Sequence, residues 1–316
     1  MIIVFSKDRA FQLEACLRTL LARCEDVADV PVRVLWTASN SEHRRTYAIL
    51  RVFFRHLPNI EFIEESSFRS DLTVIWGGIA RESWRDHVVH HLERLSASWP
   101  RNLIQPLMNP LLRPAPAVLF VVDDTVFLKS FSFAQCSNHL LAKDDGLAFS
   151  LRLGEGLTRF YMGSRPQEVP ELAPMDKDSQ VYQFRWTEAD GDFAYPLEIS
   201  SSILNSTLIL PRLLRKKWHS PNTLELALAN MAGRYKQKHP TLLTFREPRA
   251  VSIPLNIVQQ DFTDNRFGGT ECHQPDRLCD LFLKGVRADL SGLNQMSHTS
   301  VHMEIDILPA SRNEGI

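Results

Sequence analysis

The 316-residue chain lacks the motifs of several common nucleotide-binding enzymes. The apolar run at residues 2–5 leads into Ser6, Lys7, Asp8 and Arg9 rather than a glycine-rich turn, which excludes a Rossmann dehydrogenase. No GxxxxGK[ST] motif occurs, so a P-loop hydrolase is excluded as well. A haloacid-dehalogenase-type phosphatase needs two acids separated by one residue, whereas the acidic pair of this chain is adjacent.

Long apolar runs, net charge and paired cysteines are also missing. No stretch approaches the roughly 18 apolar residues that span a bilayer, and the N-terminal run is too short for a signal peptide. With 36 Lys+Arg and 37 Asp+Glu the net charge is −1, which argues against a nucleic-acid partner. The five cysteines form no CxxC pair, which argues against cysteine-bound zinc. We therefore expect reduced thiols and a cytoplasmic location.

Strand-length apolar runs alternate with helix-length patterns, which is typical of βαβ units on a mostly parallel sheet. The chain is 44% hydrophobic, enough to form the core of one large α/β fold. We expect strands at residues 2–5, 32–36, 60–63, 117–122, 147–153, 181–186, 203–210 and 249–253. We expect helices at residues 11–24, 42–55, 79–98, 130–142, 211–218, 221–238 and 275–284, of which 79–98 is rich in His and Arg and half exposed.

The acidic pair Asp123-Asp124 directly follows the apolar run at residues 117–122. Acids at the carboxyl end of a central parallel strand lie at the ligand-binding edge of the sheet. There they can hold a divalent cation that bridges two phosphates. The alternative is that Asp123 caps a turn and Asp124 points to solvent. Because two charges after six apolar residues are costly unless they face a cavity or a partner, we favour the binding site.

A second polar cluster, Ser6 to Arg9, follows the first strand and opens at the same edge of the sheet. Arg9 can pair bidentately with phosphate, and Lys7 can add a point charge. Asp8 or Ser6 can bind a base or a ribose. That Asp8 or Ser6 only caps the next helix is an equal alternative.

Three segments together resemble bacterial GT-A glycosyltransferases of the family 2 type: IIVFSKDRAFQLEACLRTL at 2–20, VVDD at 121–124 and SPNTLELAL at 220–228. The resemblance implies a Rossmann-like, mostly parallel sheet flanked by helices. It implies transfer of a sugar from a nucleoside-diphosphate sugar to a glycan or lipid-linked saccharide, as in polysaccharide biosynthesis. It also implies a divalent cation, Mn²⁺ or Mg²⁺.

The resemblance assigns roles by position. Ser6 to Arg9 meet the nucleotide, Asp123 and Asp124 bind ribose and metal-pyrophosphate, and Glu225 faces the acceptor. Residues 1–155 form the nucleotide-sugar half of the domain and residues 156–290 the acceptor half. Residues 291–316 form a tail that covers the site or is disordered.

One departure from the family pattern concerns the metal. The family triplet ends in an acid, whereas this chain has Thr125 at that place. Metal binding is then weak, absent, or shared between Asp124 and a distant histidine. His302, four residues after His298, is the candidate ligand, although a plain surface histidine is the commoner state. The same departure supports the alternative of a non-catalytic module that binds a sugar nucleotide or glycan.

Glu225 is the first candidate for the catalytic base. Ser220-Pro221 is a good helix start, so Glu225 lies in the second turn. There it can accept the acceptor hydroxyl proton or merely complement the helix dipole. Asp192, beside Gly191, is ranked behind it because DGD is also a common turn.

The run RLLRKKWH at 212–219 interleaves basic and apolar residues. Such a run is usually a solvated helix face, but it can also hold an anionic acceptor or touch a membrane. Peripheral association with the inner face of the membrane therefore stays open.

Overall fold

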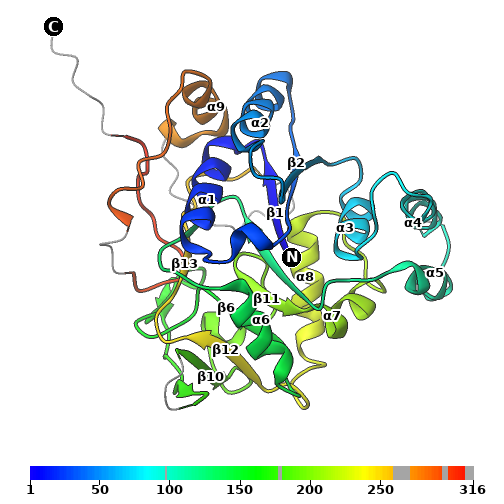
Figure 1. The fold of residues 1–316 in the computed structure, drawn as a ribbon. Helices are drawn as coiled ribbons and strands as arrows, with labels where there is room; N and C mark the ends of the chain where they lie inside the picture. Colours follow the sequence, from blue (N-terminus) through cyan, green and yellow to red (C-terminus); the bar gives the residue numbers. More distant parts are fainter. Residues whose placement is uncertain (97, 177–179, 259–270, 294–297, 310–316) are drawn as a thin grey trace, which may run out of the picture.

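The computed structural model describes residues 1–316 except 97, 177–179, 259–270, 294–297 and 310–316. Its centre is a nine-stranded sheet with the order β3-β2-β1-β4-β11-β6-β12-β10-β9 (Figure 1). The strands are β1 (Ile2–Lys7), β2 (Val32–Thr37), β3 (Ile60–Glu64), β4 (Ala117–Val122), β6 (Ala148–Ser150), β9 (Ala173–Pro174), β10 (Val181–Arg185), β11 (Ser202–Asn205) and β12 (Thr241–Phe245).

The first four strands of the sheet pair in parallel. Strand β11 is antiparallel to both β4 and β6, and β10 is antiparallel to both β12 and β9, while β6 and β12 pair in parallel. Only β10 and β11 therefore run against the other described strands of this sheet. The predicted α/β class with a mostly parallel central sheet is confirmed.

Helices and short strands complete the fold. The helices are α1 (Ala10–Arg23), α2 (Ser41–Phe54), α3 (Phe68–Trp76), α4 (Trp84–Leu95), α5 (Arg101–Met108), α6 (Phe133–Ala142), α7 (Ser206–Leu213), α8 (Pro221–Ala232) and α9 (Pro275–Leu283). Two small sheets are formed by β5 (Thr125–Phe127) with β13 (Ala250–Ser252) and by β7 (Arg159–Phe160) with β8 (Arg165–Pro166). None of the helices in the described ranges is both long and apolar enough to cross a membrane.

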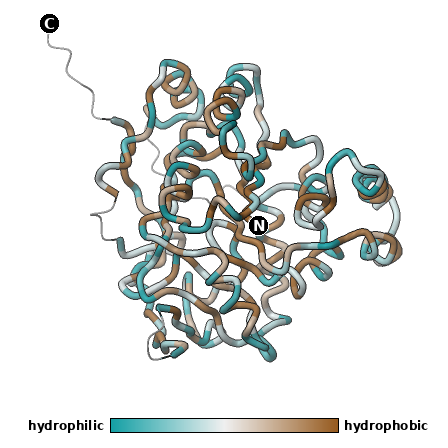
Figure 2. Tube along the Cα trace, in the orientation of Figure 1, coloured by the Kyte–Doolittle hydropathy of each residue, from teal (hydrophilic) through white to brown (hydrophobic). Residues whose placement is uncertain are grey.

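The central sheet has a hydrophobic core on each face. Successive side chains of a strand point to opposite faces, so Ile2 and Val4 enter one core while Ile3 and Phe5 enter the other. Figure 2 shows hydrophobic stretches of chain running through the centre of the molecule. Burial on both faces explains why the parallel strands are continuous apolar runs in the sequence.

Two expectations about the helices differ from the structure. The helix expected at 79–98 is the shorter α4, because the chain turns between α3 and α4 at Gly78, whose φ of 66° is left-handed. The strand expected at 203–210 ends at Asn205, and α7 starts at Ser206, five residues before the expected start at residue 211. A short apolar run does not distinguish a strand from a buried helix.

Asp26 caps α6 from a distant part of the chain. Its carboxylate accepts hydrogen bonds from the backbone N–H groups of Phe133 and Ala134, at 2.8 and 2.7 Å, and from the Ser132 hydroxyl at 2.9 Å. We expect Asp26→Ala to lower the free energy of unfolding by about 1 to 3 kcal/mol, because two helix-terminal donors lose their acceptor. Urea denaturation measures this loss, and Asp29→Ala, at an exposed acid nearby, is the control. Equal effects of the two variants would contradict the capping role.

Candidate functional site

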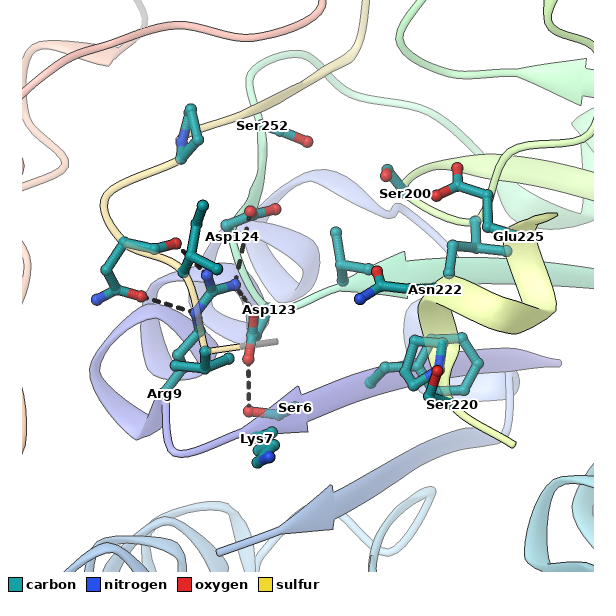
Figure 3. Close-up of a pocket in the computed structure, with 18 of the residues that line it drawn as sticks. Ser6, Lys7, Arg9, Asp123, Asp124, Ser200, Ser220, Asn222, Glu225 and Ser252 are labelled. Atoms are coloured by element: carbon teal, nitrogen blue, oxygen red, sulfur yellow. Dashed lines mark hydrogen bonds and ion pairs between the residues drawn. The ribbon is translucent and has the colours of Figure 1, made fainter. Parts of the chain in front are cut away.

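A cavity of about 850 Å³ opens at the carboxyl ends of β1 and β4. Figure 3 shows Arg9, Asp123 and Asp124 on one side of it, and Ser200, Asn222 and Glu225 on the other. The structure brings nearly all the predicted site residues to its walls: Ser6, Lys7, Arg9, Asp123, Asp124, Asp192, Glu225 and His302. Asp8 is not among the lining residues.

Asp8 instead hydrogen-bonds to the loop between β2 and α2. Its Oδ1 atom accepts a hydrogen bond of 2.7 Å from the backbone N–H of Ser39, just before α2. The backbone of Asp8 has a φ of 55°, a left-handed conformation that turns the chain from β1 into α1. Lys7 lines the cavity with an exposed side chain, so it is free to approach a phosphate.

Ser6 and Asp123 form a buried hydrogen-bonded unit. The Ser6 hydroxyl donates to Asp123 Oδ2 at 2.8 Å and shares a 2.7 Å hydrogen bond with the Tyr47 hydroxyl. Tyr47 in turn accepts the backbone N–H of Arg9 at 3.2 Å. These bonds join the ends of β1 and β4 to α2 and hold the floor of the cavity.

The Arg9 guanidinium makes its contacts within the protein. Its Nη1 lies 3.1 Å from Asp123 Oδ1 and 3.8 Å from Asp124 Oδ2. Its Nε donates to Asn256 Oδ1 at 2.8 Å, and Nη2 donates to the Asn256 carbonyl oxygen. Arg9 thus neutralises the acidic pair and links the pair to Asn256 through hydrogen bonds. We had expected Arg9 to bind a phosphate directly.

Asp124 is the less satisfied acid of the pair. Within the described part of the chain, its Oδ1 atom is buried without a hydrogen-bond partner. Burial raises the pKa of Asp124 to about 6, and Arg9 opposes that rise. Thr125, at the place of the third acid, is buried and donates to the Ser200 carbonyl oxygen at 2.8 Å. It therefore positions a loop that lines the cavity.

Asp124 and His302 carry the atoms that suit a cation. The Nδ1 atom of His302 is buried and has no hydrogen-bond partner among the described residues. Burial, and to a smaller extent the positive charge of Arg152, lowers the pKa of His302 to about 3, so its imidazole is neutral. A carboxylate suits Mn²⁺ or Mg²⁺, and a neutral imidazole can bind a transition metal. No group of three or more His, Cys, Asp or Glu side chains in the described ranges is placed to hold a metal. Because both residues line the same cavity, they are the candidates for holding a cation whose remaining ligands come from substrate phosphates.

Glu225 and Asp192 form an acidic wall around Arg152. Burial raises the pKa of Glu225 to about 7, Arg152 opposes this, and Glu198 adds to it. Burial also raises the pKa of Asp192, whose Oδ2 has no hydrogen-bond partner in the described part of the chain. Glu225 lies in the second turn of α8, whose start is fixed by a capping box between Ser220 and Thr223.

Arg152 was missed by the sequence analysis. Arg152 is buried and lines the cavity, and its Nε atom lies 3.7 Å from Glu198 Oε2. Its signal was an arginine inside the apolar run LAFSLRL at 147–153, because a buried charge needs a partner or a ligand.

A known protein that the chain resembles in sequence is a glycosyltransferase. No family model matches the chain. It is 25% identical over 214 residues to the bifunctional glycosyltransferase pgtA of Dictyostelium discoideum, a match that covers 64% of this chain but only 23% of that protein.

Two solved structures have a similar arrangement. Staphylococcus aureus TarS 1-349 has a TM-score of 0.40 and 10% identity, over 79% of this chain and 60% of that one. GalNAc-T7 with UDP, GalNAc and Mn²⁺ has a TM-score of 0.42 and 9% identity, over 80% and 43%. Both TM-scores are below 0.5, so neither likeness carries an assignment. The sequence match to pgtA agrees with the glycosyltransferase resemblance that the sequence motifs indicate.

Proposed function

We propose that this chain is a glycosyltransferase that moves a sugar from a nucleoside-diphosphate sugar to a hydroxyl of a saccharide acceptor. One observation carries the proposal: a single cavity combines the acidic pair and Lys7 on one wall with Glu225, whose pKa is about 7, on another. The first wall suits a diphosphate with its cation, and the second suits a hydroxyl that must lose a proton.

The reaction follows from this arrangement. Glu225 accepts the proton of the acceptor hydroxyl as its oxygen bonds to the anomeric carbon of the donor. The bond from that carbon to the diphosphate breaks, and its electron pair leaves on the phosphate oxygen. Lys7 faces this developing negative charge. Asp124 and His302 would hold Mn²⁺ or Mg²⁺, which when bound supplies further positive charge at the diphosphate.

Arg152 has a different task. Because it is buried beside Glu198 and facing Asp192 and Glu225, it limits how far burial raises the pKa of these acids. Glu225 can then be ionised at neutral pH and still be basic enough to take a proton. Asp192 is the second candidate for this base. The glycan or lipid-linked nature of the acceptor, and the cytoplasmic location, stay predictions.

Nucleotide binding tests the proposal. We expect at least one of UDP, GDP, dTDP and CMP to raise the melting temperature, and Mn²⁺ to enlarge the rise. At a concentration about a hundred times Kd the gain is about 2.7 kcal/mol. Asp124→Asn should remove the Mn²⁺-dependent part because it takes away a ligand, whereas Asp29→Asn, at an exposed acid, should not.

The same experiment has clear contrary outcomes. No response to any nucleotide would overturn the proposal. An unchanged Mn²⁺ response in Asp124→Asn would show that the acidic pair is purely structural. Nucleotide binding without sugar transfer to any acceptor would favour the non-catalytic binding module, to which Thr125 at the third place points.

A further inference from the structure

A helical arm, residues 79–113, holds an unusual share of exposed apolar side chains. Figure 1 shows α4 and α5 as the outermost elements on one side of the molecule, beyond α3. Of the eleven large hydrophobic side chains that are exposed among the described residues, six belong to this arm. They are Trp84, Val88, Leu95, Trp99, Leu103 and Leu107. In Figure 2 hydrophobic and hydrophilic stretches alternate along the arm.

The exposed apolar residues follow the helical repeat. On α4, Trp84, Val88 and Leu95 are spaced by four and seven residues, so they share one face. Trp99, Leu103 and Leu107 follow each other at intervals of four along α5 and the turn before it. Their exposed fractions of 53% to 65%, except for Val88 and Leu95 at 36% and 37%, are far above those of core residues. Each helix of the arm therefore presents an apolar stripe to its surroundings.

Positive charge flanks these stripes. The arm contains five arginines and three acids. Two of the acids are turned inward: Asp86 accepts the backbone N–H of Glu82, and Glu93 pairs with Arg69 at 2.6 Å. Glu82 is then the one exposed acid that the structure describes in the arm. The exposed arginines are Arg81, Arg85, Arg94 and Arg113.

On α4 the basic groups border the stripe directly. Arg85 and Arg94 lie about 100° and 80° to either side of Trp84 at the helical repeat of about 100° per residue. The Arg85 guanidinium lies 5.4 Å from the centre of the Trp84 ring. Apolar side chains between arginines on an exposed helix are typical of elements that lie at a membrane surface. The whole chain has a net charge of −1, so this positive surface is local.

We infer that the helical arm binds the surface of a bilayer with anionic headgroups, with Trp84, Trp99, Leu103 and Leu107 entering the acyl boundary. Charge favours this occupant over a second copy of the chain. A symmetric dimer through the arm would bring its arginines against those of the partner. The inference stands apart from the proposed function, since it needs neither nucleotide nor turnover.

The arm is also connected to the cavity. It follows directly after α3, and Phe68 at the start of α3 lines the cavity. A bilayer held by the arm would therefore lie one helix away from the cavity, at the end of α3 opposite Phe68. This arrangement suits an acceptor carried by a lipid, and it locates membrane contact in the arm rather than in residues 212–219.

Tryptophan fluorescence with lipid vesicles tests the inference. The other four tryptophans, Trp36, Trp76, Trp186 and Trp218, are at most 3% exposed, so a spectral change on binding reports on Trp84 and Trp99. We expect a blue shift and co-sedimentation with vesicles of phosphatidylcholine and phosphatidylglycerol in equal parts, weakened by salt. Pure phosphatidylcholine vesicles should bind at least about tenfold more weakly, because several arginines lose their counter-charges.

Matched variants identify the surface. We expect Trp84→Ser with Trp99→Ser to weaken vesicle partition by at least about tenfold, and Arg85→Glu with Arg94→Glu to remove the anionic preference. Phe53→Ser, at an exposed aromatic residue outside the arm, should partition like the unmodified protein. Circular dichroism and thermal melting check that all variants fold.

Three results would overturn the inference: no vesicle binding, binding that the arm variants leave unchanged, or equal binding to neutral vesicles. Light scattering in the absence of lipid tests the alternative that the arm binds a second copy of the chain. A dimer that dissociates in Trp84→Ser with Trp99→Ser would assign the arm to self-association instead. Nucleotide binding measured in parallel keeps this result separate from the proposed function.

Discussion

Glu225→Gln is expected to lower turnover by about a hundredfold to ten-thousandfold, the contribution typical of a general base. Glutamine keeps the size of the side chain but cannot accept the acceptor hydroxyl proton. Because Glu225 and the acidic pair lie on different sides of the cavity, nucleotide affinity in the thermal-shift assay should hardly change. A drop in turnover with retained nucleotide binding would separate a chemical role from a folding defect.

The pH profile provides an independent readout. Only the ionised form of Glu225 can take a proton, so turnover should rise as the pH increases through about 7. Glu225→Gln should lose this acidic limb. Arg152→Met should move the limb to higher pH, since Arg152 lowers the pKa of Glu225. A limb that stays in place in both variants would show that another group titrates.

Asp192→Asn is the matched comparison, because Asp192 also lines the cavity with a raised pKa. If Asp192 is not the base, its amide variant should retain most of the turnover. A large loss in Asp192→Asn together with normal turnover in Glu225→Gln would reverse the assignment. Normal turnover in both would exclude each of them.

The first half of the sheet and the acidic edge could be predicted from the sequence. Strands β1 and β4 are buried on both faces, so they stand out as short apolar runs followed by polar residues. Parallel pairing then brings Ser6 and Asp123 to the same edge, where they form a hydrogen bond. The start of α8 was also predictable, since a capping box is a local signal.

The other parts depend on tertiary contacts. Helix α3 is almost entirely buried, so it has no polar face to mark it as a helix. The meeting of Arg152 with Glu225 depends on how β6 and α8 pack, and the sequence holds no spacing that shows it. The inward turn of Arg9 toward Asn256 is equally non-local, because nearly 250 residues separate them.

The role of Arg9 leads to the second large effect, on stability. Arg9→Met is expected to lower the free energy of unfolding by about 3 to 5 kcal/mol, because it leaves buried Asp123 without its ion-pair partner. Arg44→Met is the control. Arg44 Nη2 lies 2.8 Å from Glu64 Oε1, which is shorter than the 3.1 Å between Arg9 Nη1 and Asp123 Oδ1. The side chains of Arg44 and Glu64 are both exposed, however. A surface pair of this kind contributes less than about 1 kcal/mol, so burial rather than distance should decide the outcome.

The loss in Arg9→Met should depend on pH. Burial raises the pKa of Asp123 and Arg9 opposes this, so removing Arg9 raises that pKa further. A carboxyl whose pKa is higher in the folded than in the unfolded protein destabilises the fold once the pH exceeds its ordinary value, near 3.8. The loss should therefore shrink as the pH falls toward 3.8, and Asp123→Asn combined with Arg9→Met should recover stability at neutral pH. Urea denaturation across this pH range measures both, and a loss in Arg9→Met no larger than in Arg44→Met would show that Arg9 does not neutralise the acidic pair.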